Sequence, residues 1–211
     1  MEDPWKRDEH RNDWRKIHLA QIASDRLGIA PDHFRIEKPQ LAPQFQKAPL
    51  VERPKPIVTF ATQSTAGAKY WNREMGWQEL RATMPEYYWI HTSKEGGFRG
   101  DEQAPEALEE VAGMMLSSKF FVGISSGLSW FAWALGVKTF VISGFTPEVC
   151  ERGDGIVTIQ NPTSCNSCWA WSVFDKGDWN WCPAHKDTPR QFECSKAITP
   201  AMVIEKIEQY G

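Results

Sequence analysis

The chain has 211 residues, of which 41% are hydrophobic and 24% are charged, and its formal net charge is −3. This composition is typical of a globular protein and excludes wholesale disorder, while the small negative charge provides no field that would attract nucleic acid or an anionic membrane. No apolar run reaches the length of a transmembrane helix, and the charged first residues do not resemble an export signal. We therefore expect no transmembrane segment and a cytoplasmic location.

Residues 1–50 predict an N-terminal helix followed by a proline-rich linker. Apolar residues recur at helical spacing from Trp14 to Leu27, and Gly28 stands where a helix commonly ends. Five prolines between residues 37 and 56 then indicate an extended connection rather than a packed element.

Residues 51–160 alternate short apolar runs with amphipathic stretches. We predict strands at 56–60, 87–91, 119–123, 139–143 and 155–160, and helices at 74–84, 105–116 and 127–135. This alternation predicts an α/β fold with a Rossmann-like, doubly wound and mostly parallel sheet. Residues 196–211 predict a C-terminal helix, with Thr199 as its N-cap and Pro200 at its first position.

Residues 161–195 have no regular period and contain four cysteines. Cys165 and Cys168 form a C-x2-C pair, and Cys182 and Cys194 follow. Two thiolates on one tight turn and two more distant ones can complete a tetrahedron, so we predict a metal-binding appendage whose single structural ion is zinc or iron. Three alternatives stay open: a redox C-x-x-C pair, four unlinked thiols, and His185 in place of one cysteine. The fifth cysteine, Cys150, is interpreted as an ordinary buried thiol.

Two turns between a strand and a helix have the chemistry of a phosphate site. Residues 62–71 offer hydroxyl groups, a glycine and Lys69, and residues 125–130 precede the start of a helix. The predicted donor-binding residues are Thr65, Lys69, Trp71, Ser125, Ser126, Gly127, Leu128, Ser129, Trp130 and Phe145. The alternatives are that the serines only cap a helix, that Lys69 is a surface lysine, and that the aromatic residues pack in the core.

These motifs resemble those of the glycosyltransferase family 9 heptosyltransferases. "FATQSTAGAKYWNREMGWQEL" is similar to the stretch of that family with a phosphate-contacting lysine, which corresponds to Lys69. "SSGLSWFAWALGVKTFVISGFTPE" resembles a second motif, with Ser125 in place of an acid and Trp130 in place of a histidine. Both departures, and the segment "CNSCW…GDWNWCP…RQFECSK", resemble the sequences of one subgroup, the bacterial autotransporter O-heptosyltransferases.

The resemblance implies the C-terminal, donor-binding half of a GT-B fold. It further implies transfer of heptose from ADP-heptose, or a similar nucleotide sugar, to serines of an autotransporter protein. A homo-oligomer and an iron ion on the four cysteines are also implied. The acceptor half has no counterpart in 211 residues, so three possibilities are open: a fragment, a truncated gene product, or one subunit of a split enzyme whose partner is a separate acceptor-domain subunit. No catalytic residue can be assigned.

Two other functions remain open. The first is a non-catalytic subunit or fragment that binds a sugar nucleotide or a protein, which the missing half favours. The second is a zinc-ribbon-like nucleic-acid module. The mixed charge and four tryptophans of residues 161–195 argue against this module, because nucleic-acid-binding segments are typically basic.

Overall fold

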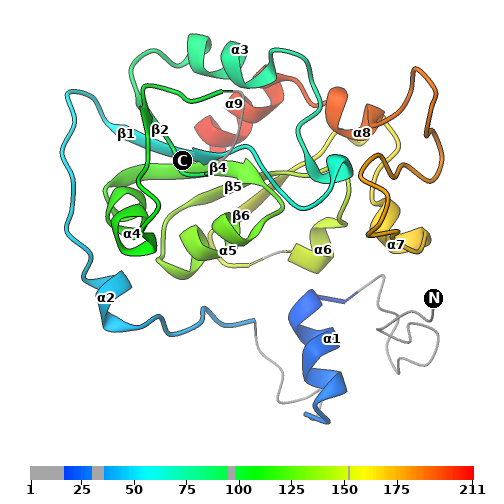
Figure 1. The fold of residues 1–211 in the computed structure, drawn as a ribbon, viewed down its shortest axis with the longest axis horizontal. Helices are drawn as coiled ribbons and strands as arrows, with labels where there is room; N and C mark the ends of the chain where they lie inside the picture. Colours follow the sequence, from blue (N-terminus) through cyan, green and yellow to red (C-terminus); the bar gives the residue numbers. More distant parts are fainter. Residues whose placement is uncertain (1–16, 30–35, 95–97, 152) are drawn as a thin grey trace.

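The computed structural model describes residues 17–29, 36–94, 98–151 and 153–211. Within these ranges lies a six-stranded sheet in the order β3-β2-β1-β4-β5-β6, and all of its strand pairs are parallel (Figure 1). The strands are β1 Ile57–Ala61, β2 Tyr88–His91, β3 Glu102–Gln103, β4 Ser118–Ile124, β5 Thr139–Ile142 and β6 Ile156–Ile159. The chain runs outward from β1 to β3 and then returns to add β4 on the other side, so the Rossmann-like order predicted from the alternation is confirmed.

The helices cover both faces of this sheet. On one face, α3 (Gly76–Thr83) and α9 (Pro200–Tyr210) bury Leu80, Val203 and Ile207 against strand side chains that include Phe60 and Phe140. On the other face lie α4 (Leu108–Leu116) and α5 (Gly127–Ala134). The central strand β1 is buried along its whole length, as expected for a parallel sheet covered on both sides.

The N-terminal part lies at one side of this core. Helix α1 (Leu19–Arg26) begins after His18, whose Nδ1 accepts a hydrogen bond from the Ala20 amide at 3.1 Å. It occupies part of the predicted helix 14–27, and residues 14–16 of that prediction lie outside the described residues. The thiol-rich residues 161–195, which we call the cysteine segment, include α7 (Cys168–Trp171) and α8 (Glu193–Lys196) and lie at the right of the sheet in Figure 1, whereas α1 lies below it.

The prediction for the proline-rich linker is wrong in part. Pro43 starts a short helix, α2 (Pro43–Gln46), because its fixed φ suits the first helical position. The linker also packs on α4, since the Val51 amide donates to Ser117 Oγ at 2.8 Å.

Besides α2, five short elements had not been predicted. They are η3 (Gly67–Lys69), α6 (Glu148–Glu151), the two-residue edge strand β3, and α7 and α8 of the cysteine segment. Arg53 holds Glu102 of β3 through two side-chain hydrogen bonds of 2.7 Å, and such a charged dipeptide carries no strand pattern.

Candidate functional site

The main cleft of the protein, about 760 Å³ in volume, lies at the carboxyl ends of the strands. Residues from the turns after β1, β2 and β4, from α5 and from α6 line it, together with Leu19 and Leu108. Strands β1 and β4 are neighbours from which the chain proceeds in opposite directions across the sheet. Ligands of open α/β folds bind at such a switch point, so this cleft is the candidate binding site.

The start of α5 presents unused hydrogen-bonding groups to the main cleft. Ser126 is the N-cap residue but makes no side-chain capping bond, and its buried Oγ has no hydrogen-bond partner among the described residues. Ser125 Oγ does not cap the helix either, because it donates to the carboxylate of Glu151. The interpretation of both serines as mere caps is therefore wrong, and the positive end of the helix dipole remains available to an anion.

Lys69 is a half-buried cation in the same cleft. Burial lowers the pKa of Lys69, and the nearby Glu151 carboxylate opposes that shift. Its Nζ lies 5.7 Å from the centroid of the Phe145 ring, which supports the ammonium group from one side. Lys69 is therefore not an ordinary surface lysine, and its position fits a phosphate ligand.

Glu151 is a residue of the main cleft that the sequence analysis missed. It lies on α6 and is buried, and burial raises the pKa of its carboxyl group, against the hydrogen bond from Ser125 and the charge of Lys69. No local pattern marks it, because its contact with Ser125 spans 26 residues of sequence. Ser93 and Lys94, which follow β2, also line the cleft and were missed.

The predicted donor-binding residues fall into two groups. Those that line the main cleft are Thr65, Lys69, Ser125, Ser126, Gly127, Leu128 and Trp130. The others, Trp71, Ser129 and Phe145, lie in the packed interior. Trp71 Nε1 donates to the Ile198 carbonyl at 3.0 Å, and Ser129 Oγ donates to the Ile124 carbonyl at 2.6 Å. Phe145 packs between Trp169, Phe174 and Trp181.

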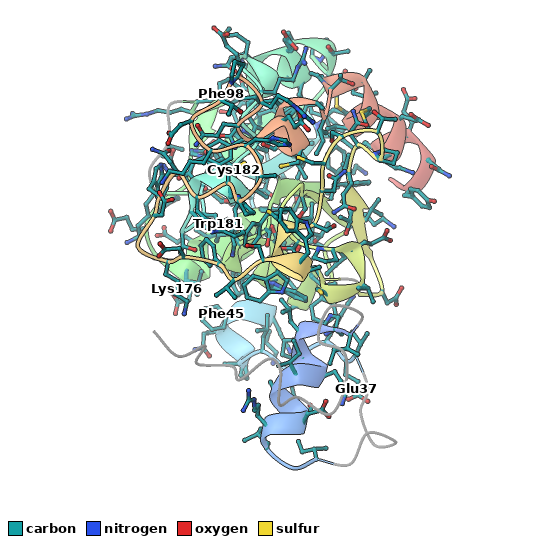
Figure 2. All side chains as sticks on the ribbon, turned by 90° about the vertical axis from the view of Figure 1, so that its right-hand side faces the viewer. Glu37, Phe45, Phe98, Lys176, Trp181 and Cys182 are labelled. Atoms are coloured by element: carbon teal, nitrogen blue, oxygen red, sulfur yellow. The ribbon has the colours of Figure 1, made fainter. Side chains whose placement is uncertain are left out.

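The four cysteines of the cysteine segment line one small cavity of about 20 Å³. It has room for one ion, because a single water needs about 10–15 Å³ by the same kind of measure. Gly144, which follows β5, closes the cavity from the sheet side. A Cβ at this position would lie 2.7 Å from Cys194 Cβ, so only glycine permits this close approach. Viewed from this side, Cys182 and Trp181 lie in front of the sheet (Figure 2).

The electrostatics of this cavity fit a cation. Burial and the neighbouring thiolates raise the pKa of Cys168, and the same causes raise the pKa of Cys194 to about 12. A bound divalent ion removes both penalties, because it neutralises the thiolates that repel one another. The lining of this cavity thus suits a cation.

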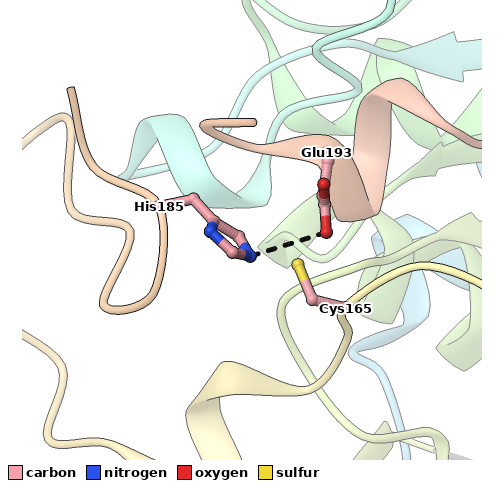
Figure 3. Close-up of side chains that lie close together, drawn as sticks. All are labelled: Cys165, His185 and Glu193. Carbon is pink, nitrogen blue, oxygen red and sulfur yellow. Dashed lines mark ion pairs between the residues drawn. The ribbon is translucent and has the colours of Figure 1, made fainter. Parts of the chain in front are cut away.

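Among the described residues, one group of three possible ligand atoms lies within 4.8 Å of one another, and no three of the four cysteine thiols lie that close together. The group is Cys165, His185 and Glu193, and His185 Nε2 is 3.5 Å from Glu193 Oε1 (Figure 3). Arg190 donates two hydrogen bonds to Glu193 and holds the pKa of that carboxyl at about 2. His185 thus lies close to the thiols, which keeps open its alternative role as a ligand. Cys150 is fully buried and does not line the cavity.

Comparison with known proteins shows which proteins the chain is similar to. No family model matches the chain. Over 90% of its length the chain is 34% identical to the autotransporter heptosyltransferase BAHTCr of Citrobacter rodentium and 32% identical to TibC of Escherichia coli O78:H11. The chain is homologous to one half of the autotransporter heptosyltransferases. It covers 49% of each of these two relatives, so about half of an autotransporter heptosyltransferase has no counterpart in it.

The solved structure of one of these relatives supports the sequence match. The crystal structure of TibC superposes with a TM-score of 0.78 at 34% identity, over 95% of this chain and 56% of that chain. TibC is described there as a dodecameric, iron-containing heptosyltransferase in complex with ADP-D-beta-D-heptose. The fold therefore matches the Rossmann-like part of a GT-B heptosyltransferase. Another relative, 32% identical over 87% of the chain, is the inactive autotransporter heptosyltransferase BimC of Burkholderia thailandensis.

Proposed function

We propose that this chain is the donor-binding half of an autotransporter heptosyltransferase and binds ADP-heptose, or a similar nucleotide sugar, in the main cleft. The observation that carries the proposal is that Lys69 and the start of α5 line the same cleft at the switch point of the sheet, and that no side chain caps this helix start. Backbone amides, an ammonium group and a helix dipole form a common diphosphate site. The complex of the homologous TibC with ADP-heptose supports this assignment.

The same groups suit the chemistry of glycosyl transfer. When the glycosidic bond to the diphosphate breaks, negative charge develops on the leaving nucleotide. Lys69 and the amides at the start of α5 stabilise that charge, which lowers the barrier. The acceptor, a serine of an autotransporter protein, and the base that deprotonates it belong to the missing half. In this proposal they come from a separate acceptor-domain subunit or from the remainder of a longer chain.

The cavity of the cysteine segment is the proposed site of one structural metal ion, held by Cys165, Cys168, Cys182 and Cys194. Iron is favoured because the homologous TibC contains iron, and zinc suits the same four thiolates. The ion supplies folding energy to a segment with little regular structure. Four thiolate ligands need a reducing compartment, so a cytoplasmic location belongs to the same proposal. Self-association is proposed by analogy with the dodecameric TibC.

Calorimetric titration of the metal-loaded protein with ADP, ADP-heptose, UDP-glucose and GDP-mannose tests the donor site. Selective binding of ADP-heptose is the expected result. Folded, metal-loaded protein that binds none of the four would overturn the proposal.

A second candidate function is a non-catalytic sugar-nucleotide-binding or protein-binding subunit. The similarity to the inactive relative BimC favours it. Incubation of the chain with ADP-heptose and an autotransporter, alone and with a supplied acceptor domain, separates the two functions. Transfer in either mixture rejects the non-catalytic function, and binding without transfer in both supports it.

A further inference from the structure

Three side chains from three separate segments meet beside the cysteine cavity, and we call them the outer group. Cys165 belongs to the C-x2-C pair, His185 to the loop after Cys182, and Glu193 to the first turn of α8. Their ligand atoms point toward one another and lie within 4.8 Å of one another (Figure 3). All three residues are half-buried, so the outer group is partly open to solvent.

The spacing and the chemistry of the outer group suit a divalent ion. Bonds of about 2.0–2.3 Å from a tetrahedral ion place its ligands roughly 3.3–3.8 Å apart. His185 Nε2 lies 3.5 Å from Glu193 Oε1, within that range. A thiolate, an imidazole and a carboxylate are the three ligand types that zinc accepts. Three protein ligands leave a fourth position open, at which another ligand can enter.

Arg190 does not close the outer group to an ion. Its guanidinium donates two hydrogen bonds of 2.6 Å to Glu193, and its side chain is 64% exposed. Each carboxylate oxygen has two lone pairs, so Glu193 can bind an ion while it accepts from Arg190. The thiolate and the carboxylate outweigh the single positive charge, which attracts a dication. The nearby guanidinium also weakens the hold on that ion, which suits a site that passes its ion on.

The four thiols are less ready to receive an ion directly. No three of them lie within 4.8 Å of one another in the described structure, so the cavity must tighten around an ion. Cys182 and Cys194 are also buried. Cys165 both lines the cavity and belongs to the outer group. An ion held by the outer group therefore already has one of its final ligands.

We infer that the outer group is a loading site, at which a divalent ion first binds and from which it passes to the four thiols. The inference rests on the proposed four-thiol ion. Cys165 stays bound throughout, while the other three thiols displace His185, Glu193 and the solvent ligand. Each thiol that binds releases its proton to solvent, and the ion keeps its oxidation state.

The test measures the release of Co²⁺ from the loaded chain to an excess of chelator. The charge-transfer absorption of Co²⁺ reports how many thiolates hold it. Loading and release follow the same path in opposite directions, so loss of a loading site slows both while the final affinity is unchanged. We expect His185→Ala to keep the wild-type cobalt spectrum and to release Co²⁺ about tenfold more slowly.

Glu193→Gln is the second variant. It should also slow the release of Co²⁺, because an amide is a weaker ligand than a carboxylate. The matched control is Glu208→Gln, which removes the same charge from an exposed position of α9 and should release Co²⁺ at the wild-type rate. Thermal unfolding of each loaded variant confirms that it is folded.

Three results would overturn the inference alone. Faster release from His185→Ala shows that His185 stabilises the bound ion. An altered cobalt spectrum in that variant makes His185 a lasting ligand. Unchanged release from both variants removes the outer group from the path. If the loaded wild-type chain lacks the absorption of four thiolates, the proposed metal site itself fails, and the loading site with it.

Discussion

The amide of Gly67 donates a hydrogen bond to the carbonyl oxygen of Trp179 at a distance of 3.1 Å. This bond joins the turn that carries Lys69 to the cysteine segment, 112 residues later in the chain (179 − 67). A second link lies nearby, because Asn72 Nδ2 donates to Ser195 Oγ at 3.0 Å. The cysteine segment therefore braces one wall of the main cleft. We expect changes in this segment to alter the affinity of the cleft for a nucleotide.

Removal of the metal should weaken nucleotide binding although the cysteine cavity and the main cleft share no lining residue. Loss of the ion releases the cysteine segment, and with it the brace on Gly67. We expect Cys182→Ala to lose the ion, to lower the melting temperature and to weaken ADP binding by about tenfold, or ~1.4 kcal/mol. Elemental analysis, thermal unfolding and calorimetry measure the three effects.

Cys150→Ala is the matched control for this experiment, because Cys150 lies outside the cavity. It should retain the full metal content. Normal ADP affinity in folded, metal-free Cys182→Ala protein would contradict the proposed brace.

Gly67→Ala should disrupt the same link, between Gly67 and Trp179, without removing a cysteine. A Cβ at Gly67 would lie 2.7 Å from the Trp179 carbonyl oxygen, so the two segments must separate. We expect a loss of 1–3 kcal/mol in the free energy of unfolding, about the cost of a broken buried hydrogen bond, and weaker ADP binding with unchanged metal content. Gly177→Ala is the control, because its Cβ would meet only Asp175 Oδ1, at 3.3 Å. Equal behaviour of the two variants would exclude the link as a brace.

Lys69→Ala should weaken binding of ADP and ADP-heptose by about tenfold, or ~1.4 kcal/mol. The reason is that the lysine supplies the half-buried positive charge of the main cleft. Calorimetry measures the change, and Lys138→Ala, a substitution beside Tyr210 of α9, serves as the control. Unchanged affinity in Lys69→Ala would remove this residue from the site.

Glu151→Gln should stabilise the chain at neutral and higher pH and have less effect at acidic pH. Burial raises the pKa of Glu151 in the folded state, so the folded protein holds its proton to a higher pH than the unfolded chain does. The free energy of unfolding therefore falls as the pH rises from the unfolded pKa through the folded one, and glutamine removes this loss.

Thermal unfolding at pH 5 and pH 8 measures this effect. A gain of ~1 kcal/mol corresponds to about 2–4 °C in melting temperature for a chain of this size. A gain in the melting temperature that is the same at both pH values would contradict the proposed titration.

The buried strands of the sheet could be predicted because each of them has a local sequence pattern. The five predicted strands are present with small shifts at their ends, since apolar runs between turn residues depend little on distant contacts. Strand β3 could not be predicted, because its two residues pair through backbone contacts and an ion pair with Arg53. The same limit applies to α6, a single turn without a repeating pattern.

Only part of the candidate site could be predicted from the sequence, because long-range contacts position some of its residues. Lys69 and the serines of the α5 turn follow strands directly, so the topology places them at one edge of the sheet. Glu151 and the internal position of Trp71 depend on contacts between distant segments, and Trp71 bonds to Ile198, 127 residues away. Such contacts leave no local periodicity.

The long-range bonds of Trp71 and Asn72 also determine when the site can form during synthesis. Their partners, Ile198 and Ser195, are synthesised 127 and 123 residues later. The first four strands can pair earlier, but the lysine turn lacks these supports until residues 195–198 have been synthesised. Contacts of such long range form late in folding, so the complete nucleotide site forms after most of the sheet.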